Sequence, residues 1–280
     1  MKSYSKIALI AYAVLLFFVF VTFGLPLLML IYDIRIVTGF NINWQVFGQL
    51  LSNTCIISLS IPITIVIAIP ISFCIYLNKH KFKFSLFALL SLYVLPCALV
   101  GKILYLLFAY DGPIHTLISA FVVELDKVDW LSSLPFSYGV IIFSIILVSI
   151  AECVIYIVIG LNRVPINVIE AAQCDGASYL KIISRILIPN IKDVLAIYSL
   201  TLLSWIATSS YSLIKQITGG GPGLNTTTYD FYIIRHYFNV SGAWGEKTAN
   251  SFSLVLFAIY MTIGLSIILT KAIVNREKKK

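Results

Sequence analysis

The sequence predicts an all-α integral membrane protein with six transmembrane helices. Of its 280 residues, 60% are hydrophobic and only 11% are charged, whereas a soluble domain carries about 25% charged residues. The mean hydropathy is +0.97, and six apolar stretches are each long enough to cross a bilayer core, which takes about 20 helical residues. Helices are required because lipid offers no hydrogen-bond partner to a free backbone amide.

The six apolar stretches follow one another along the whole chain. The first is longer than the core of a signal peptide, and no small-x-small cleavage pattern follows it, so we expect it to be a retained helix. The expected spans are Ile7–Tyr32, Ile56–Leu77, Phe84–Tyr110, Tyr138–Leu161, Val194–Ile217 and Phe252–Val274.

The basic residues between the spans predict the orientation. One side of the membrane holds 14 Lys and Arg residues, the other side holds 5, and Lys102 lies within a span. Because basic residues gather in cytoplasmic loops, we expect both termini in the cytoplasm. The same bias accounts for the net charge of +8, so nucleic-acid binding is not expected.

The sequence contains no pattern typical of a catalytic or metal site. The five cysteines include no CxxC pair and the three histidines lie in separate connections, so neither a disulfide framework nor a metal site is expected. There is no GxxxxGK[ST] motif. We therefore expect a chain that is not an enzyme, carries no cofactor and does not hydrolyse ATP itself.

The cytoplasmic connection 162–193 is predicted to fold as two short helices. The first should cover Pro165 to Cys174, Gly176 should permit a turn, and Pro189 should end the second helix before the fifth span. Ala171 and Ala172 on the surface of the first helix could enter the groove of a partner protein. The alternative is a helix that lies on the lipid surface.

The same connection resembles a known family. Glu170-Ala171-Ala172, three residues, Gly176, nine residues and Ile186-Leu187-Ile188-Pro189 are similar to the EAA signature of bacterial binding-protein-dependent ABC transporter permeases, with Ile188 in place of the usual leucine. The resemblance implies that this is a coupling helix that docks on a cytoplasmic ATPase. The implied contact residues are Glu170, Ala171, Ala172, Asp175, Gly176 and Ala177.

The external connection 218–250 begins with a glycine run and a threonine cluster. A flexible turn is one interpretation; a phosphate cradle is disfavoured because GxGxxG is also absent. From about Asn53 to Val274 the chain resembles the sugar permeases of the maltose and glycerol-phosphate uptake systems. That resemblance implies a carbohydrate or polyol substrate, and contact with an extracytoplasmic binding protein through Gly219, Gly220, Gly221 and Pro222.

Two charged residues fall inside the predicted spans, where a charge usually faces a cavity or a partner. Glu152 and Lys102 could form an ion pair, or Lys102 could reach the membrane surface. Trp205 and Tyr211 could stack on a sugar ring or simply pack. The resemblance implies a substrate pathway lined by Ser149, Glu152, Ala207 and Ser210, although Ala207 lacks the hydrogen-bonding group expected there.

The resemblance thus implies a permease subunit of an ATP-driven carbohydrate importer that works by alternating access in the bacterial cytoplasmic membrane. Its implied partners are a second permease in a heterodimer, an ATPase dimer that binds ATP, and a solute-binding protein. A permease for a polyamine, phosphate compound or peptide, or a secondary transporter, stays open as an alternative. The expected organisation is an N-terminal helix and connection (1–52), a permease core (53–274) and a basic tail (275–280).

Overall fold

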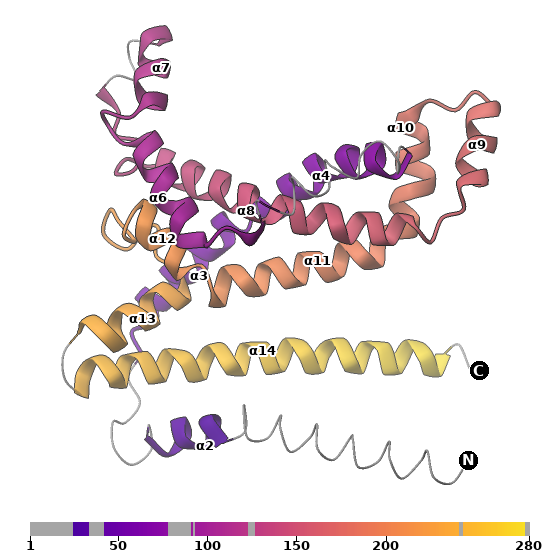
Figure 1. Ribbon diagram of the computed structural model, residues 1–280. Helices are drawn as coiled ribbons and strands as arrows, with labels where there is room; N and C mark the ends of the chain where they lie inside the picture. Colours follow the sequence, from indigo (N-terminus) through magenta and orange to yellow (C-terminus); the bar gives the residue numbers. More distant parts are fainter. Residues whose placement is uncertain are drawn as a thin grey trace. The chain divides into compact units, whose positions relative to one another are not determined.

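The computed structural model describes residues 25–33, 42–77, 91, 93–122, 127–240 and 243–277. Within these ranges every regular element is helical (Figure 1). The elements are α2 (Leu25–Tyr32), α3 (Trp44–Ile57), α4 (Ser60–Leu77), α6 (Cys97–Phe108), α7 (Pro113–Phe121), α8 (Phe136–Leu161), α9 (Ile166–Cys174), α10 (Tyr179–Ile182), the π turn η4 (Ile183–Leu187), α11 (Ile188–Thr208), α12 (Tyr211–Ile217), α13 (Tyr229–Asn239) and α14 (Ala243–Glu277).

The described residues contain four helical stretches that are long and apolar enough to cross a membrane. They are Trp44–Leu77, Cys97–Phe121, Phe136–Leu161 and Tyr179–Thr208. The predicted fourth span agrees with α8 to within two residues. Most of the predicted first span and the start of the third lie outside the described residues, and α14 is helical throughout the predicted sixth span.

Two predicted spans have the wrong bounds. The helical stretch expected from Ile56 begins twelve residues earlier at Trp44 and is interrupted after Ile57. The span expected from Val194 to Ile217 is not continuous, because α11 ends at Thr208 and α12 starts at Tyr211. The intervening Ser210 donates its hydroxyl to Asp230 in the first turn of α13, which holds this junction of α11 and α12 in place.

The expectation that Pro189 ends a helix was also wrong. The chain runs without a break from α10 through η4 into α11, with Pro189 in the first turn of α11. In the π turn the backbone N–H of Ile188 donates to the carbonyl of Ile183, five residues back. Pro189 has no N–H to contribute, and it directly follows the π turn, where the ordinary hydrogen-bond ladder of the α-helix is already shifted.

The chain divides into two compact units, and each has its own packing. The central unit covers residues 48–231, and the terminal unit combines residues 1–47 with 232–280. In the terminal unit the Asn250 amide donates to the carboxylate of Asp33, and the Phe252 ring packs 4.8 Å from Tyr232. The organisation expected from the sequence, with boundaries at residues 52 and 274, stays a prediction.

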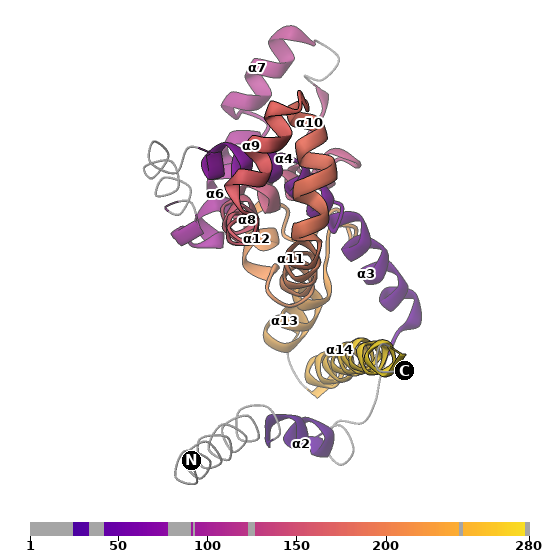
Figure 2. The same cartoon turned by 90° about the vertical axis from the view of Figure 1, so that its right-hand side faces the viewer.

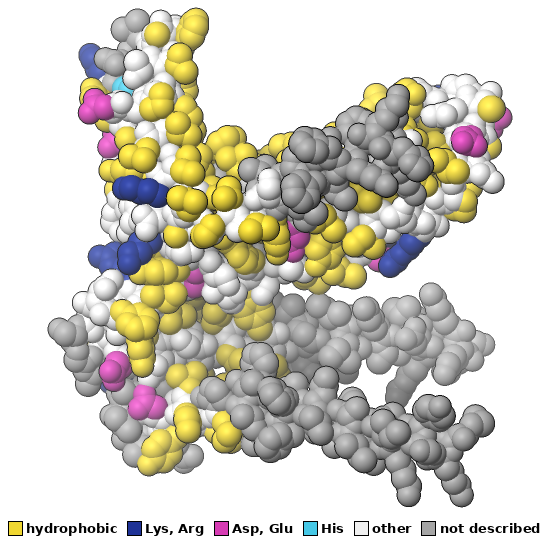
Figure 3. All heavy atoms as spheres, viewed as in Figure 1, with side chains coloured by type: hydrophobic (Ala, Val, Ile, Leu, Met, Phe, Trp, Pro, Cys, Tyr) yellow, Lys and Arg dark blue, Asp and Glu magenta, His cyan; other side chains and the backbone are white. Residues whose placement is uncertain are grey.

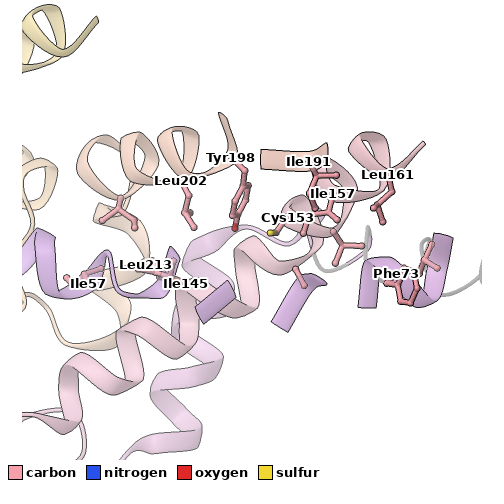
Figure 4. Packing of buried hydrophobic residues seen from close by; sticks show 14 of the residues in the cluster. Ile57, Phe73, Ile145, Cys153, Ile157, Leu161, Ile191, Tyr198, Leu202 and Leu213 are labelled. Carbon is pink, nitrogen blue, oxygen red and sulfur yellow. The ribbon is translucent and has the colours of Figure 1, made fainter. Parts of the chain in front are cut away.

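The core of the central unit forms where α4 and α11 pack along α8. Half of the most apolar stretch of α8 is buried, with Ile145, Cys153 and Ile157 facing the neighbouring helices (Figure 4). Gly160 brings α8 close to α11, since a Cβ there would lie 3.1 Å from Ile191 Cγ2. Tyr198 of α11 points toward Cys153, and its hydroxyl donates to the carbonyl of Ser149 over 3.4 Å.

Large apolar side chains also cover the outside of the molecule. Val66 is 69% exposed and Leu106 is 56% exposed, although both belong to long apolar helices. Figure 3 shows hydrophobic side chains over much of the described surface on this face, with charged side chains at a few isolated places. An exposed apolar surface of this extent is suited to lipid contact.

Candidate functional site

A cavity of about 250 Å³ lies within the central unit, where α8, α11 and the residues around Pro96 meet. Ser149 and Glu152 lie one turn apart on α8, and Leu202 and Trp205 lie one turn apart on α11. The complete lining is Tyr93, Cys97, Val148, Ser149, Glu152, Leu202 and Trp205.

The chemistry of this cavity is aromatic and acidic. Glu152 is half-buried and, among the lining residues that the structure describes, it is the only carboxylate and is accompanied by no Lys, Arg or His. The Ser149 hydroxyl donates to the carbonyl of Ile145 over 2.7 Å, so its oxygen can still accept a hydrogen bond. Trp205 adds a half-buried indole, giving the cavity an apolar face beside two oxygen acceptors.

The structure brings together two of the four residues expected along a substrate pathway. Ser149 and Glu152 both line the cavity, whereas Ala207 and Ser210 do not. Ser210 is fully buried, and its hydroxyl contacts Asp230 and Thr228 at 3.0 Å each. Ala207 is also buried, at 6% exposure, one residue before the end of α11.

The aromatic and basic residues considered from the sequence have separate surroundings. Trp205 lines the cavity, but the Tyr211 ring packs 5.2 Å from Phe231. The Lys102 ammonium lies 4.4 Å from the centre of the Tyr105 ring, on the exposed side of α6. The interpretation of Lys102 as a partner of Glu152 therefore gains no support from the structure.

The connection 218–250, expected on the external side and called the external loop below, is held by buried polar groups. Asp230 is 5% exposed and accepts hydrogen bonds from the Thr228 hydroxyl at 2.6 Å, the Ser210 hydroxyl at 3.0 Å and the Tyr211 backbone N–H at 2.5 Å. Burial raises the pKa of the Asp230 carboxyl above its ordinary value, although the hydroxyls and amides around it act in the opposite direction. This carboxylate links the end of α11 to the loop before α13.

The glycine run forms a turn that hydrogen bonds to the threonine cluster hold in place. Gly219 and Gly220 have φ values of +62° and +85°, which favour glycine. The Thr227 hydroxyl donates to the carbonyl of Gly220 over 2.9 Å. Gly220 is buried, whereas Gly219 and Pro222 are exposed, so the expected binding-protein contact could use only part of this run.

The connection 162–193, expected on the cytoplasmic side, contains the short helix that the sequence predicts. Helix α9 begins after Pro165, and Ile169 anchors it with no exposed surface. Gly176 has a φ of +75°, and the N–H of Ala177 donates to the carbonyl of Ala172 over 3.0 Å, which closes the helix end. Helices α9 and α10 lie together at one end of α8 in Figure 1 and in the rotated view of Figure 2.

The expectation that both alanines of the signature lie on the surface needs correction. Ala171 is exposed, but Ala172 is half-buried and packs against the core, because it lies one turn after the buried Ile169 on the same side of α9. The other implied contact residues, Glu170, Asp175 and Gly176, are exposed, and Ala177 is half-buried.

The sequence analysis missed several residues that the structure places beside the expected ones. Tyr93 and Cys97, on either side of Pro96, line the cavity together with Glu152. They are far from Glu152 along the sequence, and no helical periodicity connects them to it. Asn53 is 3% exposed and joins α3 to the external loop. A polar residue directly before a long apolar run was the available signal for Asn53.

The described residues hold no group of three or more His, Cys, Asp or Glu that could bind a metal ion.

Proteins with similar sequences are transport permeases, which agrees with a cavity among apolar helices. No protein-family model matches the chain. It is 25% identical over 177 residues to a sulfoquinovosyl glycerol transport system permease of Agrobacterium fabrum, covering 63% of this chain and 56% of that protein. It is 25% identical over 205 residues to the trehalose/maltose permease MalF of Thermococcus litoralis (72% and 68%). A xylose/arabinose import permease of Haloferax volcanii is 22% identical over 230 residues (78% and 72%).

A solved structure has the same fold over nearly the whole chain. It belongs to a bacterial alginate ABC transporter in complex with a periplasmic protein, with a TM-score of 0.75 and 18% identity over 94% of this chain and 92% of that one. The chain is similar in sequence to permease subunits of sugar ABC transporters. The match spans little more than half of the first relative's length. Together with the four membrane-length helical stretches, this similarity supports a multi-pass membrane protein.

Proposed function

We propose that this permease is one half of the translocation pathway of an ATP-driven, binding-protein-dependent importer for a carbohydrate, either a small saccharide or a polyol. Its two conformations would open the cavity alternately to the two sides of the membrane. A bound solute or ATP can drive such a change only by binding one conformation better than the other.

One observation carries the proposal: a cavity with sugar-binding chemistry lies among apolar helices in a chain related to sugar permeases. Carboxylate and hydroxyl oxygens accept hydrogen bonds from sugar hydroxyls, and an indole face covers an apolar ring face. Glu152, Ser149 and Trp205 supply these groups from α8 and α11. Several relatives carry trehalose/maltose, xylose/arabinose or lactose in their names, which supports the carbohydrate class.

The proposed assembly contains a second permease, an ATPase dimer and an extracytoplasmic binding protein. Among residues 25–33, 42–77, 91, 93–122, 127–240 and 243–277 no phosphate-binding loop is present, so ATP is assigned to the separate ATPase subunits. Helix α9 is assigned to ATPase docking, with both termini in the cytoplasm. The exposed Glu170, Ala171 and Asp175 would form its contact surface, and the exposed Gly219 and Pro222 would face the binding protein.

The test is uptake by the reconstituted assembly. The permease, purified with its partner subunits and placed in vesicles with binding protein outside, should accumulate a labelled saccharide only when ATP is present at the ATPase. Accumulation that needs an ion gradient and no ATP would establish a secondary transporter instead. ATP-dependent uptake of a polyamine or peptide, with no saccharide transported, would contradict the carbohydrate assignment.

The role of α9 has its own matched pair of variants. Ala171→Trp adds bulk to an exposed position of the proposed docking surface and should reduce ATP-dependent uptake roughly tenfold or more, as expected for loss of a close helix contact. Gln173→Trp adds the same bulk at another exposed position, about 200° round the helix from Ala171, and should keep most of the uptake. Equal uptake by both variants and the unchanged chain would contradict the docking role.

A further inference from the structure

From the charge of the cavity we infer that Glu152 is a specificity residue that excludes acidic saccharides, so that the solutes of this permease are neutral or amino saccharides. The inference rests on the proposed function and deepens it by naming a substrate class. Among the residues that the structure describes, Glu152 supplies the only carboxylate of the cavity lining, and no Lys, Arg or His accompanies it there.

An acidic solute in this cavity would lie near the negative charge of Glu152, and no positive charge of the described lining would offset the repulsion. Charges interact several times more strongly beside protein than in bulk water, and like charges placed together discriminate effectively against wrong partners. The nearest basic residue on the neighbouring α6, Lys102, is exposed and lies over the Tyr105 ring instead. The described lining of the cavity therefore provides no cation to pair with a carboxylate or sulfate on the solute.

The aromatic lining strengthens the same preference. The face of an indole ring is electron-rich, which attracts a cation and repels an anion. Trp205 lines the cavity together with Glu152, and a solute that stacks on its indole face would meet the same preference for positive charge that Glu152 sets. A neutral sugar is accepted as well, because its hydroxyls donate to the Glu152 carboxylate in charge-assisted hydrogen bonds.

The oxygen acceptors lie on one helix face. Glu152 and Ser149 are one turn apart on α8, so one sugar ring can reach both, while Leu202 and Trp205 of α11 present apolar surface. The Ser149 hydrogen is engaged by the carbonyl of Ile145, which leaves Ser149 as an acceptor. The described lining thus offers two hydrogen-bond acceptors, Glu152 and Ser149, and no charged hydrogen-bond donor. This pattern suits a solute that carries many hydrogen-bond donors.

The experiment compares saccharides of one ring size and different charge. The reconstituted complete assembly is given glucose, glucosamine and glucuronate, and equilibrium binding of each to the detergent-solubilised assembly is measured in parallel. The expected result is that glucuronate binds and is transported at least about tenfold less well than glucose, with glucosamine no worse than glucose. In the Glu152→Gln variant the disadvantage of glucuronate should shrink by at least about threefold.

The control is Glu246→Gln, which makes the same chemical change at an exposed position of α14 and should leave the order of the three sugars unchanged. If glucuronate equals or exceeds glucose, or if Glu152→Gln keeps the original ratio, the inference is overturned while the importer assignment stands. If the assembly neither binds nor transports any of the three sugars but transports a non-sugar solute with ATP, the proposed carbohydrate function fails, and the inference fails with it.

Discussion

Gly220 shows how one missing side chain allows the external loop to close. A Cβ at this position would lie 2.8 Å from both the Phe231 ring and the Thr227 hydroxyl oxygen. Its φ of +85° is also unfavourable for any other residue. The loop therefore needs glycine here for two separate reasons, close approach and backbone conformation.

Gly219 provides the matched comparison. Its φ is +62°, but a Cβ there would meet nothing within 4 Å. Both Gly219→Ala and Gly220→Ala should cost about 1 kcal/mol in backbone strain, and Gly220→Ala should cost about 1–3 kcal/mol more through overpacking. Apparent Tm values in detergent check this order; equal Tm values for the two variants would show that the Gly220 contacts are not made.

Asp230 gives the loop a dependence on pH. Burial raises its pKa in the folded protein above the value of about 3.9 expected in an unfolded chain. A raised carboxyl pKa means that its stabilising contribution is complete below pH 3.9 and is lost as the pH rises through the folded-state pKa. The apparent Tm should therefore fall over that window more steeply than in Asp230→Asn. Parallel curves for the two proteins would contradict a buried titrating Asp230.

Single residues were predicted from the sequence with uneven success. Glu152 could be related to a cavity because a charge in an apolar helix requires a polar surrounding, whereas Ser149 was implied only by the family resemblance. Ala207 and Ser210 have different surroundings because α11 ends between them, at Thr208, and no periodicity in the sequence marks that end. Tyr93 and Cys97 reach the cavity only through tertiary packing, which one sequence does not encode locally.

Helix α3 is joined to the external loop by one buried amide. The Asn53 side chain donates to the carbonyls of Leu224 at 2.7 Å and Thr227 at 2.9 Å, and its oxygen accepts from the Tyr138 hydroxyl at 2.8 Å. Three segments that are far apart in the sequence therefore meet at Asn53. The glycine and threonine loop is positioned by helix packing in addition to its own turns.

Replacing this amide tests the connection. Asn53→Leu keeps the approximate size but removes both donors. The Leu224 carbonyl keeps the Thr227 N–H as a partner, whereas the buried Thr227 carbonyl loses its Asn53 donor, and a buried carbonyl left without a partner costs about 1–3 kcal/mol. The apparent Tm should fall, and protease cleavage near the exposed Pro222 should become faster. Tyr138→Phe removes a single hydroxyl and should have the smaller effect; an equal or larger effect would show that Asn53 does not organise the loop.

The helices themselves were largely predictable, because apolar length alone marks a span in a bilayer. Helix α8 agrees with its prediction, and α9 follows from the proline and glycine that bracket it. The passage of the helix through Pro189 was not predictable. It depends on a π turn at Ile183–Leu187, and the sequence pattern contains no feature that distinguishes a π turn from an ordinary one.

The whole molecule presents three features along one chain that fit a multi-component importer. These are the cavity around Glu152, the exposed side of α9 at one end of α8, and the ordered glycine loop after α12. Each has exposed or unfilled surface that a lone subunit leaves without a protein partner. Fold and class were available from composition and the EAA resemblance, whereas the arrangement of the cavity required the structure.

The most direct test of this account is to purify the chain from its native membrane in mild detergent and identify the proteins that accompany it. The account predicts a second six-helix permease and an ATPase with a GxxxxGK[ST] loop in stoichiometric amounts, with Ala171→Trp losing the ATPase and Gln173→Trp keeping it. A chain that purifies alone, and in vesicles moves solute without ATP, would contradict the account.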